Sequence, residues 1–209
     1  VRKKNNLNKL SSRTVKLIQN SKRPLILIGN GVKLSKSKQL VSKLIKKNKI
    51  PYACSWATID EFSSKDNLNA GTFGVAATRY GNFAIQNSDL LICLGLRLSS
   101  QIIGSNQYNF SPDSKKILVE IDKNELNSHR LPKIDVKINA DVNFFLKNLI
   151  SKKIIFKKNQ LKKWREKIIF LKNQYPVVEP KHYLKKDYVD PYAFFNELSK
   201  HIKINSILI

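Results

Sequence analysis

Short runs of consecutive apolar residues constrain the fold of this chain more than any other feature. Leu25–Ile28 and Asp89–Leu94 are two such runs, and neither shows the apolar–polar alternation of a strand with one face in water. Between them, apolar residues recur at helical spacing in a lysine-rich background. Strand, turn and helix in this order predict a βαβ unit, and therefore an α/β fold with a doubly wound, mostly parallel sheet and flanking helices. The helical residues are Leu40, Val41, Leu44 and Ile45.

Further elements extend this pattern along the chain. A helix is predicted for Ala76–Asn87, interrupted by Gly81, and another for Val142–Ile150. Asp141 immediately precedes the second of these helices and can cap its amino end. Three more apolar runs bring the number of predicted strands to five: Ile50–Ser55, Ile117–Asp122 and Val136–Ala140.

Amphipathic segments flank this α/β region. Residues 1–22 predict a helix with Leu7, Leu10, Leu17 and Ile18 on one stripe. From residue 151 lysines alternate with apolar residues, and a second apolar stripe predicts a basic helix. We expect this helix to pack against another part of the protein, with an anionic membrane surface as the alternative. Its stripe consists of Leu161, Trp164, Ile168 and Leu171.

The carboxyl-terminal part predicts a linker and then new structure. Residues 175–187 contain two prolines and predict an extended segment. Asp190 and Pro191 supply an N-cap and a first-turn proline for a helix over Tyr192–Ile202. The last four residues, 206–209, predict the beginning of a strand.

The net charge of +24 raises the question of nucleic acid or membrane binding. The basic residues are mostly lysines spread along the chain, without interleaved aromatic residues, so we expect neither partner. Cys54 and Cys93 lie in apolar segments without metal-ligand spacing, and we expect both to be buried thiols. The three histidines form no zinc pattern.

Glycine turns mark the candidate ligand site. Gly95, Leu96 and Arg97 directly follow an apolar strand, where an open α/β sheet binds ligands and where glycine lets a phosphate approach the backbone. Gly29-Asn30-Gly31 follows the first strand, but it lacks the third glycine of a dinucleotide fingerprint, so a tight turn with positive φ is the alternative. Glu120, near the end of its strand, can accept a hydrogen bond from a ribose hydroxyl or support the next turn.

Five motifs in this order resemble the central domain of thiamine-diphosphate-dependent enzymes of the acetolactate synthase type, a Rossmann-like domain. They are the opening strand Arg23–Gly31; Gly71–Gly74, which resembles a Gly-x-His-Gly loop; Asn87–Leu98, which resembles a Ser-Asp-Leu strand ending in Gly-x-Arg-Phe; Val119–Asp122, which resembles an Asp-Ile-Asp strand; and Asp190–Phe195, which resembles the first helix of the diphosphate-binding domain.

The resemblance implies an FAD site, because flavin-containing members bind FAD through these loops. Three departures count against it here: Phe73 replaces a histidine, Gln101 replaces an arginine, and residues 77–81 resemble an insertion. The positions implied to face a dinucleotide are Gly29, Asn30, Gly31, Gly71, Thr72, Phe73, Gly74, Gly95, Leu96, Arg97, Glu120, Ile121, Asp141 and Val142.

The resemblance also implies a division of the chain and a larger parent protein. Residues 1–22 would be a linking helix from a missing amino-terminal domain, 23–150 the central domain, 151–187 a linker helix and extended linker, and 188–209 the start of the carboxyl-terminal domain. Thiamine diphosphate, Mg²⁺ and the catalytic residues would lie in the missing domains. We therefore expect an inactive fragment of a cytoplasmic homodimer or tetramer that decarboxylates a 2-keto acid and passes the remaining carbon fragment to an acceptor.

Two other classes of function remain open at this stage. A free-standing nucleotide-binding or electron-transfer module would need the same glycine turns and the same sheet. A basic nucleic-acid-binding domain would need the same charge.

Overall fold

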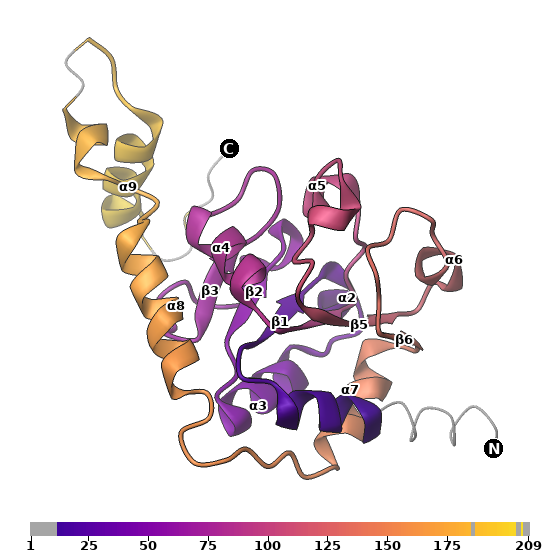
Figure 1. The fold of residues 1–209 in the computed structure, drawn as a ribbon. Helices are drawn as coiled ribbons and strands as arrows, with labels where there is room; N and C mark the ends of the chain where they lie inside the picture. The colour runs from indigo at the N-terminus through magenta and orange to yellow at the C-terminus, as the bar shows by residue number, and fades with distance from the viewer. Residues whose placement is uncertain (1–11, 185–186, 204–205, 207–209) are drawn as a thin grey trace.

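The computed structural model describes residues 12–184, 187–203 and 206, and these form a sheet with helices on both faces (Figure 1). Within the described residues the sheet has six strands, and all neighbouring pairs are parallel. The predicted α/β fold with a doubly wound parallel sheet is thus confirmed. The strands are β1 (Pro24–Ile28), β2 (Tyr52–Cys54), β3 (Asn69–Thr72), β4 (Leu90–Leu94), β5 (Lys115–Glu120) and β6 (Val136–Asn139).

The strand order is β3-β2-β1-β4-β5-β6. The chain builds outward from β1 to one edge, returns to place β4 beside β1, and then builds outward to the other edge. β1 and β4 pair in register from Pro24 opposite Leu90 to Ile28 opposite Leu94, so their carboxyl ends lie at the same level. This is the order of dinucleotide-binding folds, whose ligands lie outside the point where the direction of winding reverses.

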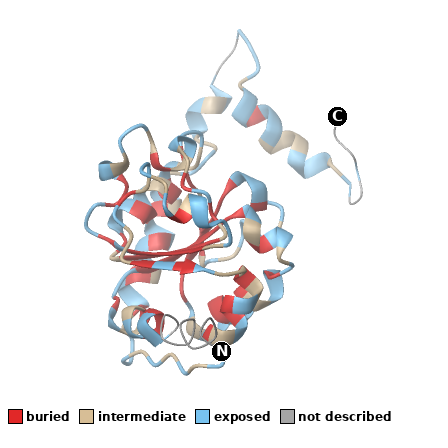
Figure 2. Cartoon of the chain, turned by 90° about the vertical axis from the view of Figure 1, so that its right-hand side faces the viewer, coloured by how far each residue is buried: buried red, intermediate tan, exposed pale blue. Residues whose placement is uncertain are grey.

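Each face of the sheet buries its own apolar layer. Ile26 and Ile28 belong to one core cluster, whereas Leu25 and Leu27 belong to the other, because successive side chains of a strand point to opposite faces. Figure 2 shows the sheet as a buried layer between the helices. The first cluster includes side chains from the helix at residues 12–20, α3 (Lys38–Asn48) and α7 (Val142–Ile150), and the second from α4 (Arg79–Asn87) and α8 (Lys162–Gln174).

Shorter elements lie in the connections. The α-helical ones are α2 (Asn30–Leu34), α5 (Ser100–Ile103) and α6 (Lys123–Leu126), and the 3₁₀ turns are Trp56–Thr58, Gln107–Asn109 and Pro180–Tyr183.

The predicted apolar stripe of α8 packs on the chain's own sheet. Trp164, Ile168 and Leu171 are buried, and the Trp164 indole N–H donates to the carbonyl oxygen of Pro24 in β1 at 2.8 Å. The helix therefore covers the central sheet, in agreement with the expected packing role. No helix in the described residues combines the length and apolar character needed to cross a bilayer.

Three local predictions were wrong. Residues 69–72 form β3, an additional strand, although Gly71–Gly74 was predicted to be a glycine loop. α4 begins at Arg79 rather than Ala76, because the Thr78 side chain caps it by accepting from the Gly81 N–H. Gly81 continues this helix, and a Cβ at this position would lie 1.8 Å from the Thr72 carbonyl oxygen.

The last described helix, α9 (Pro191–His201), projects away from the sheet (Figures 1 and 2). As predicted, Asp190 caps it, accepting from the Tyr192 N–H at 2.9 Å. Leu7, Leu10 and most of the predicted strand at 206–209 lie outside the described residues, and the proposed domain limits stay predictions.

Candidate functional site

A cleft of about 520 Å³ opens at the carboxyl ends of β1, β4 and β5, where the winding of the sheet reverses. Half of the predicted site residues line it, although they come from three separate connections of the chain. The position is the one that the strand order favours for a ligand. The predicted residues brought together here are Asn30, Gly31, Gly95, Leu96, Arg97, Glu120 and Ile121.

Three glycines form the contact between the β1 and β4 turns. A Cβ on Gly29 would lie 2.2 Å from the Gly95 carbonyl oxygen, and a Cβ on Gly31 would lie 2.7 Å from the Gly95 Cα. Gly95 itself has φ of +55°. Positive φ is not the reason for glycine at position 29, whose φ is −105°, so the tight-turn alternative fails there. Close backbone approach is what requires glycine at Gly29.

The backbone amides of these glycines are already hydrogen-bonded within the protein. The Gly29 N–H donates to the Leu94 carbonyl at 3.0 Å, and the Gly31 N–H donates to the Gly95 carbonyl at 2.9 Å. The Gly95 N–H donates to the Val119 carbonyl at 2.9 Å. These bonds join the turns after β1 and β4 to each other and to β5. A phosphate needs N–H groups that point at it, and these three point at carbonyl oxygens instead.

The charged side chains at the cleft pair with protein groups. Arg97 Nη2 lies 2.9 Å from Glu125 Oε1 on α6. The Glu120 carboxylate turns back and accepts from the N–H groups of Ile121 and Asp122, at 2.8 and 3.1 Å. Asp122 caps α6 by accepting from the Asn124 N–H. The predicted arginine therefore faces a carboxylate, and Glu120 supports its own turn.

An apolar wall completes the cleft. Leu34 is 75% exposed, Ile121 67% and Trp56 44%, and all three line the cavity. The Trp56 indole N–H donates to the Ala76 carbonyl at 3.1 Å, which ties the β2 connection to the loop before α4. Trp56 and Glu125 were not among the predicted site residues. The position of Trp56 directly after the predicted strand Ile50–Ser55 was the signal available for the first.

The predicted Gly71–Gly74 loop lies apart from this cleft. Gly71 and Gly74 have φ of +89° and +117°, so glycine is needed for the backbone. Phe73 is fully buried in the core cluster with Ala84 and Ile103. Thr72 lines a second cavity of about 530 Å³, beside Arg79, Tyr175, Glu179, His182 and Tyr192, and Gly74 lines a third of about 250 Å³.

Asp141 and Val142 have structural roles at the end of β6. The Asp141 carboxylate accepts from the N–H groups of Asn143 and Phe144, at 2.8 and 3.2 Å, and so caps α7 as predicted. Val142 is buried in the core. Neither residue lines the cleft at β1 and β4.

The residues present do not fit a flavin dinucleotide. The implied FAD residues fall into separate hollows and core positions, the glycine amides are hydrogen-bonded within the sheet, and the one arginine is paired with Glu125. A diphosphate would face the carboxylates of Glu120, Asp122 and Glu125.

The remaining reactive groups are structural within the described residues. These residues contain no group of three or more His, Cys, Asp or Glu side chains that could hold a metal ion. Cys54 and Cys93 are free and buried, as expected. Burial raises the pKa of each thiol to about 12.

Strand order and the cleft at its reversal point define a Rossmann-like, doubly wound α/β domain. Comparison with known families then gives the particular one: residues 11–149, more than half of the chain, match the model described as thiamine pyrophosphate enzyme, central domain. The chain belongs to this family, as its motifs predicted.

Individual relatives agree with the family match. The chain is 31% identical over 167 residues to the acetolactate synthase large subunit of Pyropia yezoensis, covering 79% of this chain and 28% of that protein. It is 28% identical over 192 residues to the acetolactate synthase isozyme 1 large subunit of Escherichia coli, covering 92% and 32%. The Cyanidium caldarium large subunit is 31% identical over 189 residues, covering 88% and 31%. The chain thus spans less than a third of the length of these relatives.

Proposed function

We propose that this chain is the central domain, with its outgoing segment, of a thiamine-diphosphate-dependent enzyme that decarboxylates a 2-keto acid and transfers the remaining carbon fragment to an acceptor. The family match over residues 11–149 carries the proposal. The strand order and the glycine contact between β1 and β4 support it, because they fit two of the motifs that resemble this family, Arg23–Gly31 and Asn87–Leu98.

The proposed role of the chain is to support catalysis rather than to perform it. In the described residues the reactive thiols are buried, and no cluster of metal-ligand side chains is present. Thiamine diphosphate and Mg²⁺ would be held by parts of the protein other than this chain. When bound, thiamine diphosphate supplies the electron sink for loss of CO₂ from the keto acid.

The proposed surroundings of the domain are further domains of the same polypeptide and a second subunit, in a homodimer or tetramer in the cytoplasm. The surface of α9 supports the first of these: Tyr192, Phe194 and Phe195 are all exposed on it, a large apolar surface for an isolated helix. The two free thiols accord with a reducing compartment.

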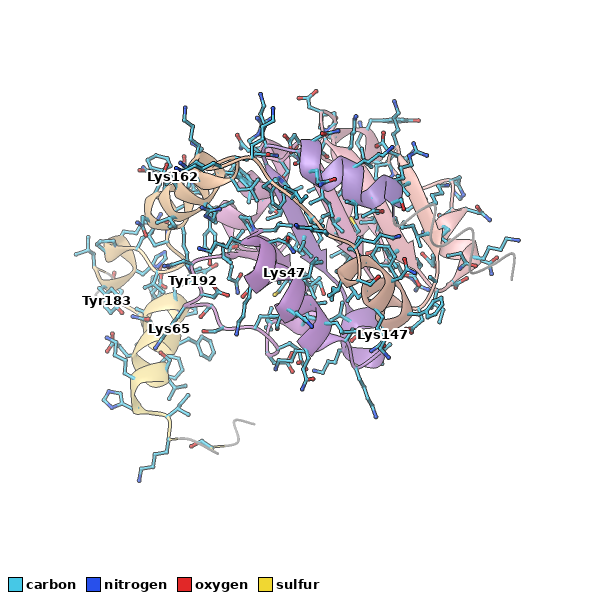
Figure 3. The ribbon with its side chains drawn as sticks, turned by 90° about the horizontal axis from the view of Figure 1, so that it is seen from below. Lys47, Lys65, Lys147, Lys162, Tyr183 and Tyr192 are labelled. Carbon is cyan, nitrogen blue, oxygen red and sulfur yellow. The ribbon has the colours of Figure 1, made fainter. Side chains whose placement is uncertain are left out.

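A basic nucleic-acid-binding role has little support from the charge distribution. Figure 3 shows labelled lysines on separate elements: Lys47 on α3, Lys147 on α7 and Lys162 on α8. A recognition surface gathers such charges on one face or along one helix.

The experiment is an assay of the polypeptide encoded by the complete reading frame around this sequence. With pyruvate as the first 2-keto acid tested, we expect CO₂ release that requires added thiamine diphosphate and Mg²⁺, and none from the 209-residue chain alone. We also expect the flanking codons to encode a Gly-Asp-Gly…Asn motif. If that motif is missing and a panel of 2-keto acids gives no thiamine-dependent CO₂ release, the proposal is wrong.

A further inference from the structure

The cleft at β1, β4 and β5 stands where dinucleotide-binding folds hold a diphosphate, but its local charge is acidic. Among the described residues that line it, Glu120, Asp122 and Glu125 are carboxylates and Arg97 is the cation. The Arg97 side chain is 68% exposed and the Glu125 side chain 27%, so the acid is the more buried member of this ion pair. A phosphate entering here would meet two carboxylates beyond the one that Arg97 neutralises.

The three glycine amides do not compensate for this charge. The N–H groups of Gly29, Gly31 and Gly95 hold the strand ends together, and breaking these bonds would expose unpaired carbonyls in the centre of the fold. α2 has only five residues, so its amino end contributes little helix dipole to attract an anion. The cleft is therefore lined by three carboxylates, and the amides of Gly29, Gly31 and Gly95 are not available to an anion.

The apolar wall and the acceptors together define what the cleft does fit. Leu34, Trp56 and Ile121 offer exposed apolar surface to a ring, and the carboxylates of Glu120 and Asp122 can accept from hydroxyl or amino donors. We propose that this cleft binds a phosphate-free ring compound with hydroxyl donors, of the nucleoside class, and discriminates against nucleoside diphosphates and dinucleotides. This inference does not depend on the activity of the parent enzyme.

The test compares three probes on the full 209-residue chain: adenosine, adenosine diphosphate and FAD, each titrated by calorimetry. A salt concentration of about 0.15 M screens charges beyond about 8 Å. The +24 net charge of the chain then contributes little to probe affinity, and the groups that line the cleft determine which probe binds more tightly. We expect adenosine to bind about tenfold or more tightly than the other two. Trp56 fluorescence gives a second readout for the two adenosine probes, because Trp164, the other tryptophan, is buried between α8 and the sheet, away from the cleft.

A charge variant tests the cause of the selectivity. Glu125→Gln removes the partner of Arg97 and one negative charge, so the affinity for adenosine diphosphate should rise about tenfold while that for adenosine changes less than about twofold. The matched control is Glu166→Gln, which removes a carboxylate paired with Lys162 on α8. This control should change neither affinity. Trp56→Ala should weaken adenosine binding by removing part of the apolar wall.

Three results would overturn the inference. Wild-type chain that binds FAD or adenosine diphosphate more tightly than adenosine would show that the acidic groups do not select the ligand. Adenosine that fails to bind at millimolar concentration would show that the cleft is not a nucleoside site. An unchanged diphosphate affinity in Glu125→Gln would refute the role given to the Arg97–Glu125 pair.

Discussion

The Cα of Gly29 lies directly against the Gly95 carbonyl: a Cβ on Gly29 would be 2.2 Å from the oxygen and 2.5 Å from the Cα of Leu96. All of these neighbours are backbone atoms, so they cannot move aside as a flexible side chain can. The contact joins the turn after β1 to the turn after β4, and the neighbouring residues Asn30, Gly95 and Leu96 line the cleft.

Gly29→Ala should therefore destabilise the fold strongly. The added methyl group can be accommodated only by separating two paired strand ends, and overpacking of this kind costs about 1–3 kcal/mol or more. Urea unfolding followed by circular dichroism would measure the loss of unfolding free energy.

Two other glycines separate the steric cost from the backbone cost. Gly104 has φ of +81° and open space around it, so Gly104→Ala should cost about 1–3 kcal/mol from backbone strain alone. Gly95 has φ of +55°, and a Cβ there would lie 2.6 Å from the Gly31 Cα, so Gly95→Ala should cost more than Gly104→Ala. Equal stability of wild type and Gly29→Ala would contradict the close contact.

The central strands could be predicted from sequence because they are buried on both faces. Leu25–Ile28 and Leu90–Leu94 carry an apolar residue at every position, which leaves little choice of environment. β3 was missed because its sequence, Asn-Ala-Gly-Thr, has no such signal. It is a four-residue edge strand that pairs with β2, and its register shifts between Tyr52 and Cys54.

The candidate site was only partly predictable for a related reason. Asn30, Gly95 and Glu120 lie at or just after the ends of their strands and line one cleft, because the carboxyl ends of parallel strands share one edge of the sheet. The sequence could not show that Arg97 would pair with Glu125, since this depends on the path of the chain through α6. Nor could it show that the glycine amides would be taken up by neighbouring strands.

The packing of α8 on the sheet gives a second stability prediction. In Trp164→Phe the ring stays apolar, but the hydrogen bond from the indole N–H to the Pro24 carbonyl is lost. Loss of a partner for a buried carbonyl costs about 1–3 kcal/mol. Chemical denaturation of the 209-residue chain should show this loss.

The control for this variant lies on the other side of the same helix. Phe170 is exposed, so Phe170→Ala should change the unfolding free energy by less than about 0.5 kcal/mol. If Trp164→Phe is as mild as Phe170→Ala, the hydrogen bond from Trp164 to Pro24 contributes little to stability.

Asp141 offers a test that separates capping from ligand binding. Asp141→Ala removes the acceptor for the Asn143 and Phe144 N–H groups and should destabilise the chain by about 0.5–2 kcal/mol. Asp141→Asn keeps an acceptor oxygen and should cost less. Adenosine affinity should stay at the wild-type value in both variants, because Asp141 lies outside the cleft. A loss of affinity without loss of stability would instead place Asp141 in the binding site.

The two thiols give a prediction about pH. Burial raises the pKa of Cys54 and Cys93 to about 12 from an ordinary value of 9.0, so at pH 8 about one native thiol in 10⁴ is ionised and neither should react with a thiol-specific disulfide reagent. In denaturant both should react.

Because the unfolded thiols release their protons first, the contribution of the two buried thiols to stability is present below pH 9 and is lost progressively between pH 9 and 12. Cys54→Ala should weaken this loss, measured as unfolding free energy against pH at pH 8 and above. Rapid reaction of either native thiol at pH 8, or an unchanged pH dependence in Cys54→Ala, would contradict the buried, protonated state.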